Sequence, residues 1–188
     1  MIFLMRHGQD DTSRLGGWSD AGLSAAGREQ ARRAGETIAQ GSYDIRHIFS
    51  SDLPRAKETA DIIAGRLGMG VCLLKAVRET NNGDLAGISK ERFQAAYPGL
   101  YYSSLDWEEQ YPNGESPKQF RDRIREAWED FRNKADALDG NVLLVTHGGV
   151  IDVILCTENA VPYTNRRVSY KADYAEILPV RTDSGLPR

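Results

Sequence analysis

Apolar residues fall into short continuous runs that alternate with longer stretches in which apolar positions recur every three or four residues. The short runs are typical of buried strands and the longer stretches of amphipathic helices. We expect strands over residues 2–5, 45–49, 71–74, 141–146 and 174–178. Alternating strands and helices predict an α/β fold, here a three-layer sandwich with a mainly parallel central sheet and helices on both faces.

The first two predicted helices have recognisable ends. Ser24 can cap a helix that runs towards Gln40, and Pro54 suits the first turn of a second helix that stops before Gly68. Both helices follow a predicted strand, so they support the alternating pattern.

The clearest helix begins at Ser116 and stops at Gly140, and a further helix is expected after Gly149. In the helix that begins at Ser116, the apolar positions recur with the helical period: Phe120, Ile124, Trp128, Phe131, Ala135 and Leu138. We expect residues 1–188 to form one domain, because the chain shows no repeat, linker or low-complexity tract.

Residues 80–115 interrupt this rhythm and form a predicted cap region of irregular structure. The segment contains glycines and prolines together with Tyr97, Tyr101, Tyr102, Trp107 and Tyr111. Two interpretations are open: a cover that packs on the sheet, or a lid that faces the substrate, since long loops at sheet ends often carry function.

Composition and charge narrow the class of protein. With 40% hydrophobic and 27% charged residues and a net charge of −3, the chain resembles an ordinary globular protein without a basic stripe for nucleic acid. Cys72 and Cys156 lie in apolar runs and are interpreted as buried thiols of a reducing compartment. No apolar run is long enough for a membrane span or a signal peptide, so we expect a cytoplasmic protein without a membrane partner.

Two predicted strands end in a histidine that is followed by glycine. Arg6, His7 and Gly8 follow the first strand, and His147 and Gly148 follow the fourth. Ligands of open α/β sheets bind beyond the carboxyl ends of the strands, so these residues meet if the two strands are neighbours. A glycine after each histidine allows the backbone to approach a ligand and turn sharply.

A third segment, IFSSDLPRAKETAD, favours an anion site. Arg55 lies in the first helical turn after Pro54, where free N–H groups and the helix dipole attract anions. Together with Arg6 it provides two guanidinium groups, which suit a tetrahedral phosphate. Glu79 follows the third predicted strand.

These segments together resemble the histidine phosphatase superfamily, the phosphoglycerate-mutase-like proteins, over almost the whole chain. The motifs occur in the family's order: RHG at 6–8, LSAAGREQA at 23–31, SSDLPRAKETA at 50–60, RET at 78–80 followed by GDLAG, GES at 114–116 and VTHGG at 145–149. RHG alone is weak, whereas the ordered set is strong.

The resemblance implies a metal-independent and cofactor-free phosphoryl transfer. His7 is then the nucleophile that forms a phosphohistidine, and Arg6, Arg55 and His147 bind the phosphoryl oxygens, with Gly8 and Gly148 lining the site. Glu79 protonates the leaving alkoxide and then activates water.

The chain departs from the family pattern after His7. The family usually continues with Glu-Thr and places an asparagine six residues after the histidine, whereas this chain has Gln9, Asp10 and, at the sixth position, Ser13. A serine hydroxyl can still donate to phosphate. Asp84 is the second candidate for the proton donor.

Three functional alternatives follow. A phosphatase is favoured over a mutase, because the segment with Asp106, Glu108 and Glu109 is acidic where mutases carry basic residues, and these side chains would repel a highly anionic substrate if they face the cleft. A pseudophosphatase that binds phosphate without turnover is the third.

The expected partners are phosphate and a small phosphorylated metabolite, and the aromatic residues of the cap suggest an ester with a planar or apolar body. Such bodies include a nucleotide or the ribazole phosphate of related enzymes. The chain is expected to act as a monomer or homodimer.

A cysteine-based phosphatase has a superficial case in the C-x5-R spacing of Cys72 and Arg78. That chemistry needs a loop of small residues around the phosphate, whereas the residues between them are typical of a strand and its exit. The remaining histidine, His47, is interpreted as structural.

Overall fold

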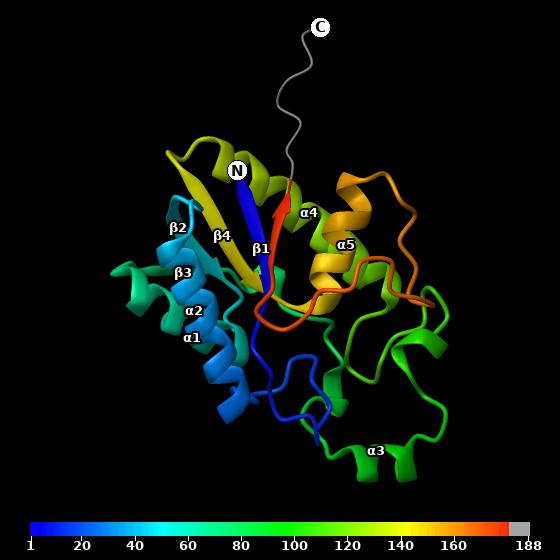
Figure 1. Cartoon of the computed structure of the whole chain (residues 1–188). Coiled ribbons are helices and arrows are strands. Elements are labelled where there is room, and N and C mark those ends of the chain that lie inside the picture. Colours follow the sequence, from blue (N-terminus) through cyan, green and yellow to red (C-terminus); the bar gives the residue numbers. More distant parts are fainter. Residues whose placement is uncertain (181–188) are drawn as a thin grey trace, which may run out of the picture.

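The computed structural model describes residues 1–180, which form a five-stranded sheet between layers of helices (Figure 1). The strands are β1 (Ile2–Arg6), β2 (Ile45–Ser50), β3 (Val71–Leu73), β4 (Asn141–Thr146) and β5 (Ile177–Val180). Their order across the sheet is β3-β2-β4-β1-β5. Only the β1–β5 pair is antiparallel, so the predicted mainly parallel sheet is confirmed.

The fifth strand lies slightly later in the chain than the sequence predicts. The expected strand began at Tyr174, but this residue makes only an isolated bridge with Arg6, and β5 runs antiparallel to β1 up to Val180. Pro179 is tolerated there because β5 is an edge strand, where no ladder needs its missing N–H group.

Two pairs of helices cover the two faces of the sheet (Figure 1). α1 (Ala25–Gln40) and α2 (Pro54–Leu67) pack on one face, while α4 (Pro117–Asp136) and α5 (Gly148–Glu158) pack on the other. The predicted three-layer sandwich is therefore confirmed.

The helix ends follow the capping residues. The Ser24 hydroxyl accepts the N–H of Gly27 at the start of α1, and Ser116 and Gln119 exchange side-chain and backbone hydrogen bonds at the start of α4. Gly68 ends α2 in the left-handed conformation, with φ of 67°.

Alternation along the strands divides the core into two clusters. In β1, Ile2 and Leu4 face the α4–α5 layer, whereas Phe3 and Met5 face the α1–α2 layer. Because successive side chains of a strand point to opposite faces, a continuous apolar run is what a sheet covered on both sides requires. The buried strands therefore hold their carboxyl ends in fixed positions.

The cap over residues 80–115 contains one α-helix, α3 (Lys90–Ala96), and short 3-10 turns at Gly83–Leu85 and Tyr102–Ser104. A further 3-10 turn, Lys75–Val77, precedes the cap. Leu85, Phe93, Leu105 and Tyr111 form a separate buried cluster inside it. The cap thus has a small apolar core of its own, apart from the two clusters of the sheet.

The two cysteines differ. Cys156 is buried in α5 as predicted, but Cys72 is exposed, so that prediction is wrong. β3 is a three-residue edge strand, and its middle and last residues are exposed to solvent. Within residues 1–180, no helix is long and apolar enough to cross a membrane.

Candidate active site

The two histidines meet because their strands are neighbours. β1 and β4 pair in parallel with Arg6 opposite Thr146, so His7 and His147 follow at the same edge of the sheet. Their ring centroids lie 5.1 Å apart. Both side chains are buried, at 5% and 0% exposure. The structure therefore brings together the two His-Gly segments that the sequence predicts to meet.

The His7 ring is oriented so that one of its two nitrogens is unprotonated. Its Nδ1 lies 2.7 Å from the carbonyl oxygen of Gly8, which can only accept, so Nδ1 carries the proton. Arg55 Nε donates to Nε2 at 3.2 Å, so Nε2 holds the lone pair. Burial, with Arg55 and Arg6 nearby, lowers the pKa of His7 to about 3. The ring is therefore neutral at pH 7, as a nucleophile must be.

Arg55 lies in the first turn of α2 and is almost completely buried, at 2% exposure. Its Nη2 donates to the carbonyl of Gly17 at 2.7 Å, and its Nε lies 3.4 Å from a carboxylate oxygen of Asp10. Burial lowers the pKa of Arg55, while the carboxylates of Glu79 and Asp10 oppose that shift. The guanidinium is thus held rigidly beside His7.

Two nitrogens beside His7 have no partner. Arg6 Nη1 donates to the carbonyl of Ala172 at 3.1 Å, and its guanidinium lies 3.9 Å from the ring centroid of Tyr174. Arg6 Nε and His147 Nδ1, however, are buried without a hydrogen bond to any residue of 1–180. Buried polar atoms are normally paired, so this arrangement suits an acceptor-rich ligand such as phosphate.

His147 is fixed on its other side by a serine. Its Nε2 lies 2.8 Å from the hydroxyl of Ser51, which follows β2. Burial, followed by the charge of Arg55, holds the pKa of His147 well below its ordinary value. The ring reaches the site as a neutral group, positioned by two strand ends.

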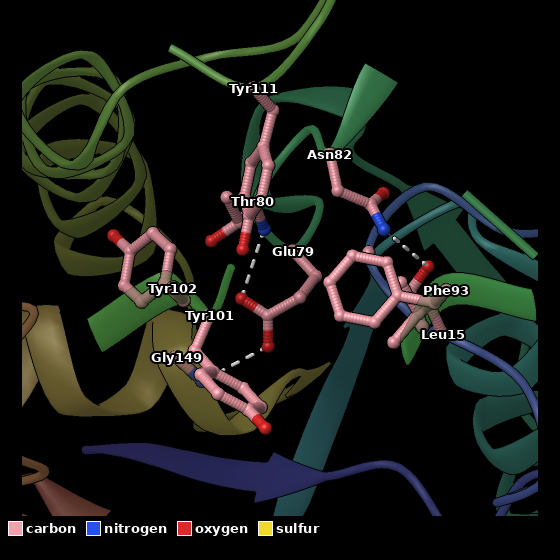
Figure 2. Close-up of a pocket in the computed structure, with 11 residues that line it drawn as sticks. Leu15, Glu79, Thr80, Asn82, Phe93, Tyr101, Tyr102, Tyr111 and Gly149 are labelled. Atoms are coloured by element: carbon pink, nitrogen blue, oxygen red, sulfur yellow. Dashed lines mark hydrogen bonds between the residues drawn. The ribbon is translucent and has the colours of Figure 1, made fainter. Parts of the chain in front are cut away.

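Glu79 lines the same cavity as His7. This cavity has a volume of about 260 Å³, and its wall includes Arg6, His7, Glu79 and Gly148. The Glu79 carboxylate accepts the N–H of Thr80 at 3.0 Å and that of Gly149 at 3.1 Å (Figure 2). The second bond places it at the N-terminus of α5, directly after His147.

Gly8 has a different task from the one that the sequence suggests, whereas Gly148 lines the cavity as expected. The N–H of Gly8 donates to Thr59 and is not available to a ligand, and a side chain at Gly8 would collide with the backbone oxygen of Gly27 in α1. Gly8 is therefore needed for helix packing. Gly148 lines the cavity but has room for a Cβ, whereas a Cβ at Gly149 would lie 2.5 Å from Glu79 Oε1.

Two further expectations are not met. The hydroxyl of the exposed Ser13 donates to Asp11 at 2.7 Å, and Ser13 does not line the His7 cavity. Asp84 is exposed, and its carboxylate accepts from the amide of Asn113. The loop after Gly8 turns away towards the cap, so Ser13 lies outside the site and Glu79 is the carboxyl group that faces it.

The acidic segment also lies elsewhere. The structure has a second cavity, which lies beneath the cap. Neither this cavity nor the His7 cavity is lined by Asp106, Glu108 or Glu109. Asp106 is exposed and forms an ion pair with Arg166 at 3.1 Å. The expected repulsion of an anionic substrate therefore has no structural basis.

The backbone around Glu79 is held by residues that sequence reasoning missed. Arg123 of α4 donates to the carbonyls of Ala76, Arg78 and Glu79 at 2.8, 3.0 and 3.1 Å. Its guanidinium also binds both carboxylate oxygens of Glu115. The GES motif was the available signal, because Glu115 is its middle residue.

A second layer of support comes from Trp18 and Asp152. Trp18 Nε1 donates to the carbonyl of Glu79 at 2.7 Å. Asp152 Oδ1 accepts the N–H groups of Ser169 and Tyr170 at 3.0 and 2.8 Å. It thereby fixes the segment 168–172, of which four residues line the His7 cavity: Val168, Tyr170, Lys171 and Ala172.

The cysteine-based alternative fails on geometry. Arg78 forms a bidentate ion pair with Asp52 at 2.6 and 2.7 Å, and Cys72 lies exposed on β3. His47 Nε2 lies 2.9 Å from the carbonyl of Asp139, remote from the catalytic edge of the sheet. Within residues 1–180, no three His, Cys, Asp or Glu side chains gather into a potential metal site.

Comparisons with known proteins agree with this geometry. The model of the histidine phosphatase superfamily (branch 1) matches residues 2–188. A glucosyl-3-phosphoglycerate phosphatase of Mycolicibacterium vanbaalenii is 34% identical over 173 residues, covering 87% of this chain and 76% of the relative. A phosphoglycerate mutase-like protein of Arabidopsis thaliana is 34% identical over 157 residues, covering 80% and 67%. The structure of the mycobacterial glucosyl-3-phosphoglycerate phosphatase with VO3 is similar with a TM-score of 0.77 at 31% identity, covering 94% and 90%.

Proposed function

The chain belongs to the histidine phosphatase superfamily, and on that premise we propose that it hydrolyses a small phosphomonoester through a phosphohistidine formed on His7. The observation that carries this proposal is the unprotonated Nε2 of His7, in a buried ring surrounded by Arg6, Arg55 and His147. These three residues would bind the phosphoryl oxygens.

The first step forms a bond between His7 Nε2 and phosphorus while the bond from phosphorus to the ester oxygen breaks. Arg55 Nε, which donates to Nε2 in the free protein, would transfer this hydrogen bond to a phosphoryl oxygen. Arg6 Nε and His147 Nδ1 supply two further nitrogens for the oxygens. Glu79 gives a proton to the leaving oxygen.

The second step reverses the roles. Glu79, now ionised, takes a proton from water as the water oxygen attacks phosphorus, and the bond between phosphorus and Nε2 breaks. Phosphate leaves, and His7 recovers its lone pair. The hydrogen bond from Nδ1 to Gly8 keeps the ring in the same orientation through both steps.

Water is the proposed acceptor. A mutase must retain a second anionic group of its substrate next to the reacting phosphate. Glu79 lines two cavities: the His7 cavity contains Arg6 and Lys171, whereas the cavity beneath the cap is lined by no Lys or Arg of residues 1–180. This favours hydrolysis over transfer to a second substrate hydroxyl. A pseudophosphatase is disfavoured because each chemical role has a side chain in place.

The proposed setting is the cytoplasm, with phosphate and a phosphorylated metabolite as the only partners, no nucleic acid or membrane contact, and a monomer or homodimer as the working form. The exposed thiol of Cys72 suits a reducing compartment.

The test is hydrolysis of p-nitrophenyl phosphate in EDTA by the wild type, His7→Ala and His47→Ala. His47 is the matched control, since its ring binds only the carbonyl of Asp139. We expect turnover that resists EDTA, falls at least a thousandfold in His7→Ala and persists in His47→Ala. Acid-labile phosphate on His7 after rapid quenching would support the intermediate. Equal turnover in wild type and His7→Ala would reject it.

A further inference from the structure

A second cavity lies on the other side of Glu79, beneath the cap (Figure 2). It has a volume of about 360 Å³. Glu79 and Gly149 line both this cavity and the His7 cavity, so the two spaces meet at the proposed proton donor. A substrate whose phosphate reaches His7 would therefore place its leaving group here.

The walls of this cavity are aromatic and aliphatic. Phe93 and Tyr111 come from the buried cluster of the cap, Leu15 comes from the loop after β1, and Tyr101 closes the outer side with 57% of its surface exposed. Figure 2 shows the rings of Phe93 and Tyr101 on either side of the Glu79 carboxylate. We call this space the aromatic cavity. Its size suits a group of one or two rings.

Two polar side chains of the aromatic cavity, those of Asn82 and Tyr102, already have hydrogen-bond partners. Asn82 accepts the N–H of Trp18 and donates to the carbonyl of Gly16. The hydroxyl of Tyr102 lies 3.1 Å from that of Tyr163. Among residues 1–180, no Lys or Arg lines the cavity. A substrate carboxylate would therefore find no cationic partner in this cavity, and an unpaired buried charge weakens binding strongly.

We propose that the substrate is a phosphomonoester whose alcohol carries an uncharged aromatic ring. The ring occupies the aromatic cavity, where stacking and edge contacts with Phe93, Tyr101 and Tyr111 stabilise it. The ester oxygen then lies beside Glu79, and the phosphate lies beside His7. This inference rests on the proposed function and specifies its substrate class.

The test compares three esters of primary alcohols, which place the same demand on the proton donor: 2-phenylethyl phosphate, glycerol 1-phosphate and 3-phosphoglycerate. We expect kcat/KM for the phenylethyl ester to exceed the other two at least tenfold. Phosphate release measures all three reactions, and p-nitrophenyl phosphate with His7→Ala as the control reports whether the enzyme is active at all.

Two exposed tyrosines of the cap provide matched variants. Tyr101 lines the aromatic cavity, whereas Tyr97 is 38% exposed, stacks on Phe93 and does not line it. Tyr101→Ala should reduce the preference for the phenylethyl ester over glycerol 1-phosphate about fivefold, while Tyr97→Ala should preserve it. Circular dichroism of both variants tests whether they fold like the wild type.

The outcomes separate the two proposals. Equal or higher kcat/KM for glycerol 1-phosphate or 3-phosphoglycerate in an active enzyme overturns the aromatic substrate and leaves the His7 reaction intact. The same loss of preference in Tyr97→Ala as in Tyr101→Ala overturns the cavity assignment. Failure to hydrolyse any ester, without phosphate on His7, overturns the proposed function and with it this inference.

Discussion

The His7 cavity and the aromatic cavity share one wall at Glu79 but are built from different material. The first lies at the end of β1 and the start of α5, and its His7 side chain is contacted by the buried Arg55 of α2. The second is formed largely by the cap, whose side chains belong to a separate small cluster. The chemistry therefore rests on groups held by the sheet, while the proposed choice of substrate rests largely on the cap.

The largest effect is expected from a substitution that alters only the groups around His7. Arg55→Lys replaces a planar group that contacts His7, Gly17 and Asp10 with a single ammonium that cannot span them. We expect kcat/KM to fall about 100- to 1,000-fold for every ester, whatever its body. The control is Arg66→Lys, an exposed arginine near the end of the same helix. A loss that depends on the body of the ester would contradict the separation.

Glu79→Gln changes the residue that both cavities share, and its effect on kcat/KM should depend on whether the leaving group needs a proton. The amide cannot donate a proton to an alkoxide, so kcat/KM for 2-phenylethyl phosphate should fall about 100-fold. Nitrophenolate leaves without protonation, so the loss for p-nitrophenyl phosphate should stay below about tenfold. Asp84→Asn is the matched control, because Asp84 faces away from the site. Equal losses on both esters would exclude a proton-donor role for Glu79.

The burial of His7 should appear in the pH dependence of stability. Folding lowers the pKa of His7 from 6.5 to about 3, so between these values the unfolded chain binds more protons and acidification favours unfolding. From pH 6.5 to pH 5 this group should cost about 2 kcal/mol of unfolding free energy.

The measurement is urea unfolding at pH 7 and pH 5 for wild type and His7→Gln. On acidification, the unfolding free energy of His7→Gln should fall by about 2 kcal/mol less than that of the wild type. His47→Gln should behave like the wild type. An unchanged difference between the two pH values in His7→Gln would refute a neutral buried His7. Truncation of side chains in the cap should leave the difference in unfolding free energy between pH 7 and pH 5 unchanged.

The smallest expected effect concerns the support of the shared wall. Arg123→Lys leaves a charge on α4 but loses most of the bonds to the backbone around Glu79. We expect kcat/KM for alkyl esters to fall about tenfold, with a smaller effect on p-nitrophenyl phosphate, because Glu79 becomes misplaced. Arg125→Lys on the exposed face of the same helix is the control. A uniform loss on both esters would indicate a purely structural role for Arg123.

Much of the sheet and of the His7 site at its edge could be predicted from the sequence, because the signals involved are local in the chain. Continuous apolar runs identify strands that are buried on both faces. Capping residues such as Ser24 and Ser116 mark helix starts, because each side chain accepts the N–H of the residue three positions later. Because ligands of parallel sheets gather at the carboxyl ends of strands, His7 and His147 could be expected to meet before any contact was known.

The tertiary structure alone decided which groups support, surround and complete that site. Ser51 binds His147 from 96 positions away in the chain, Gly8 is constrained by α1, and Arg123 holds the loop of Glu79 from α4. Ser13, close to His7 in sequence, turned out to lie outside the site. Periodicity and capping depend on neighbours along the chain, whereas these contacts depend on how separate elements pack, and no local pattern records that packing.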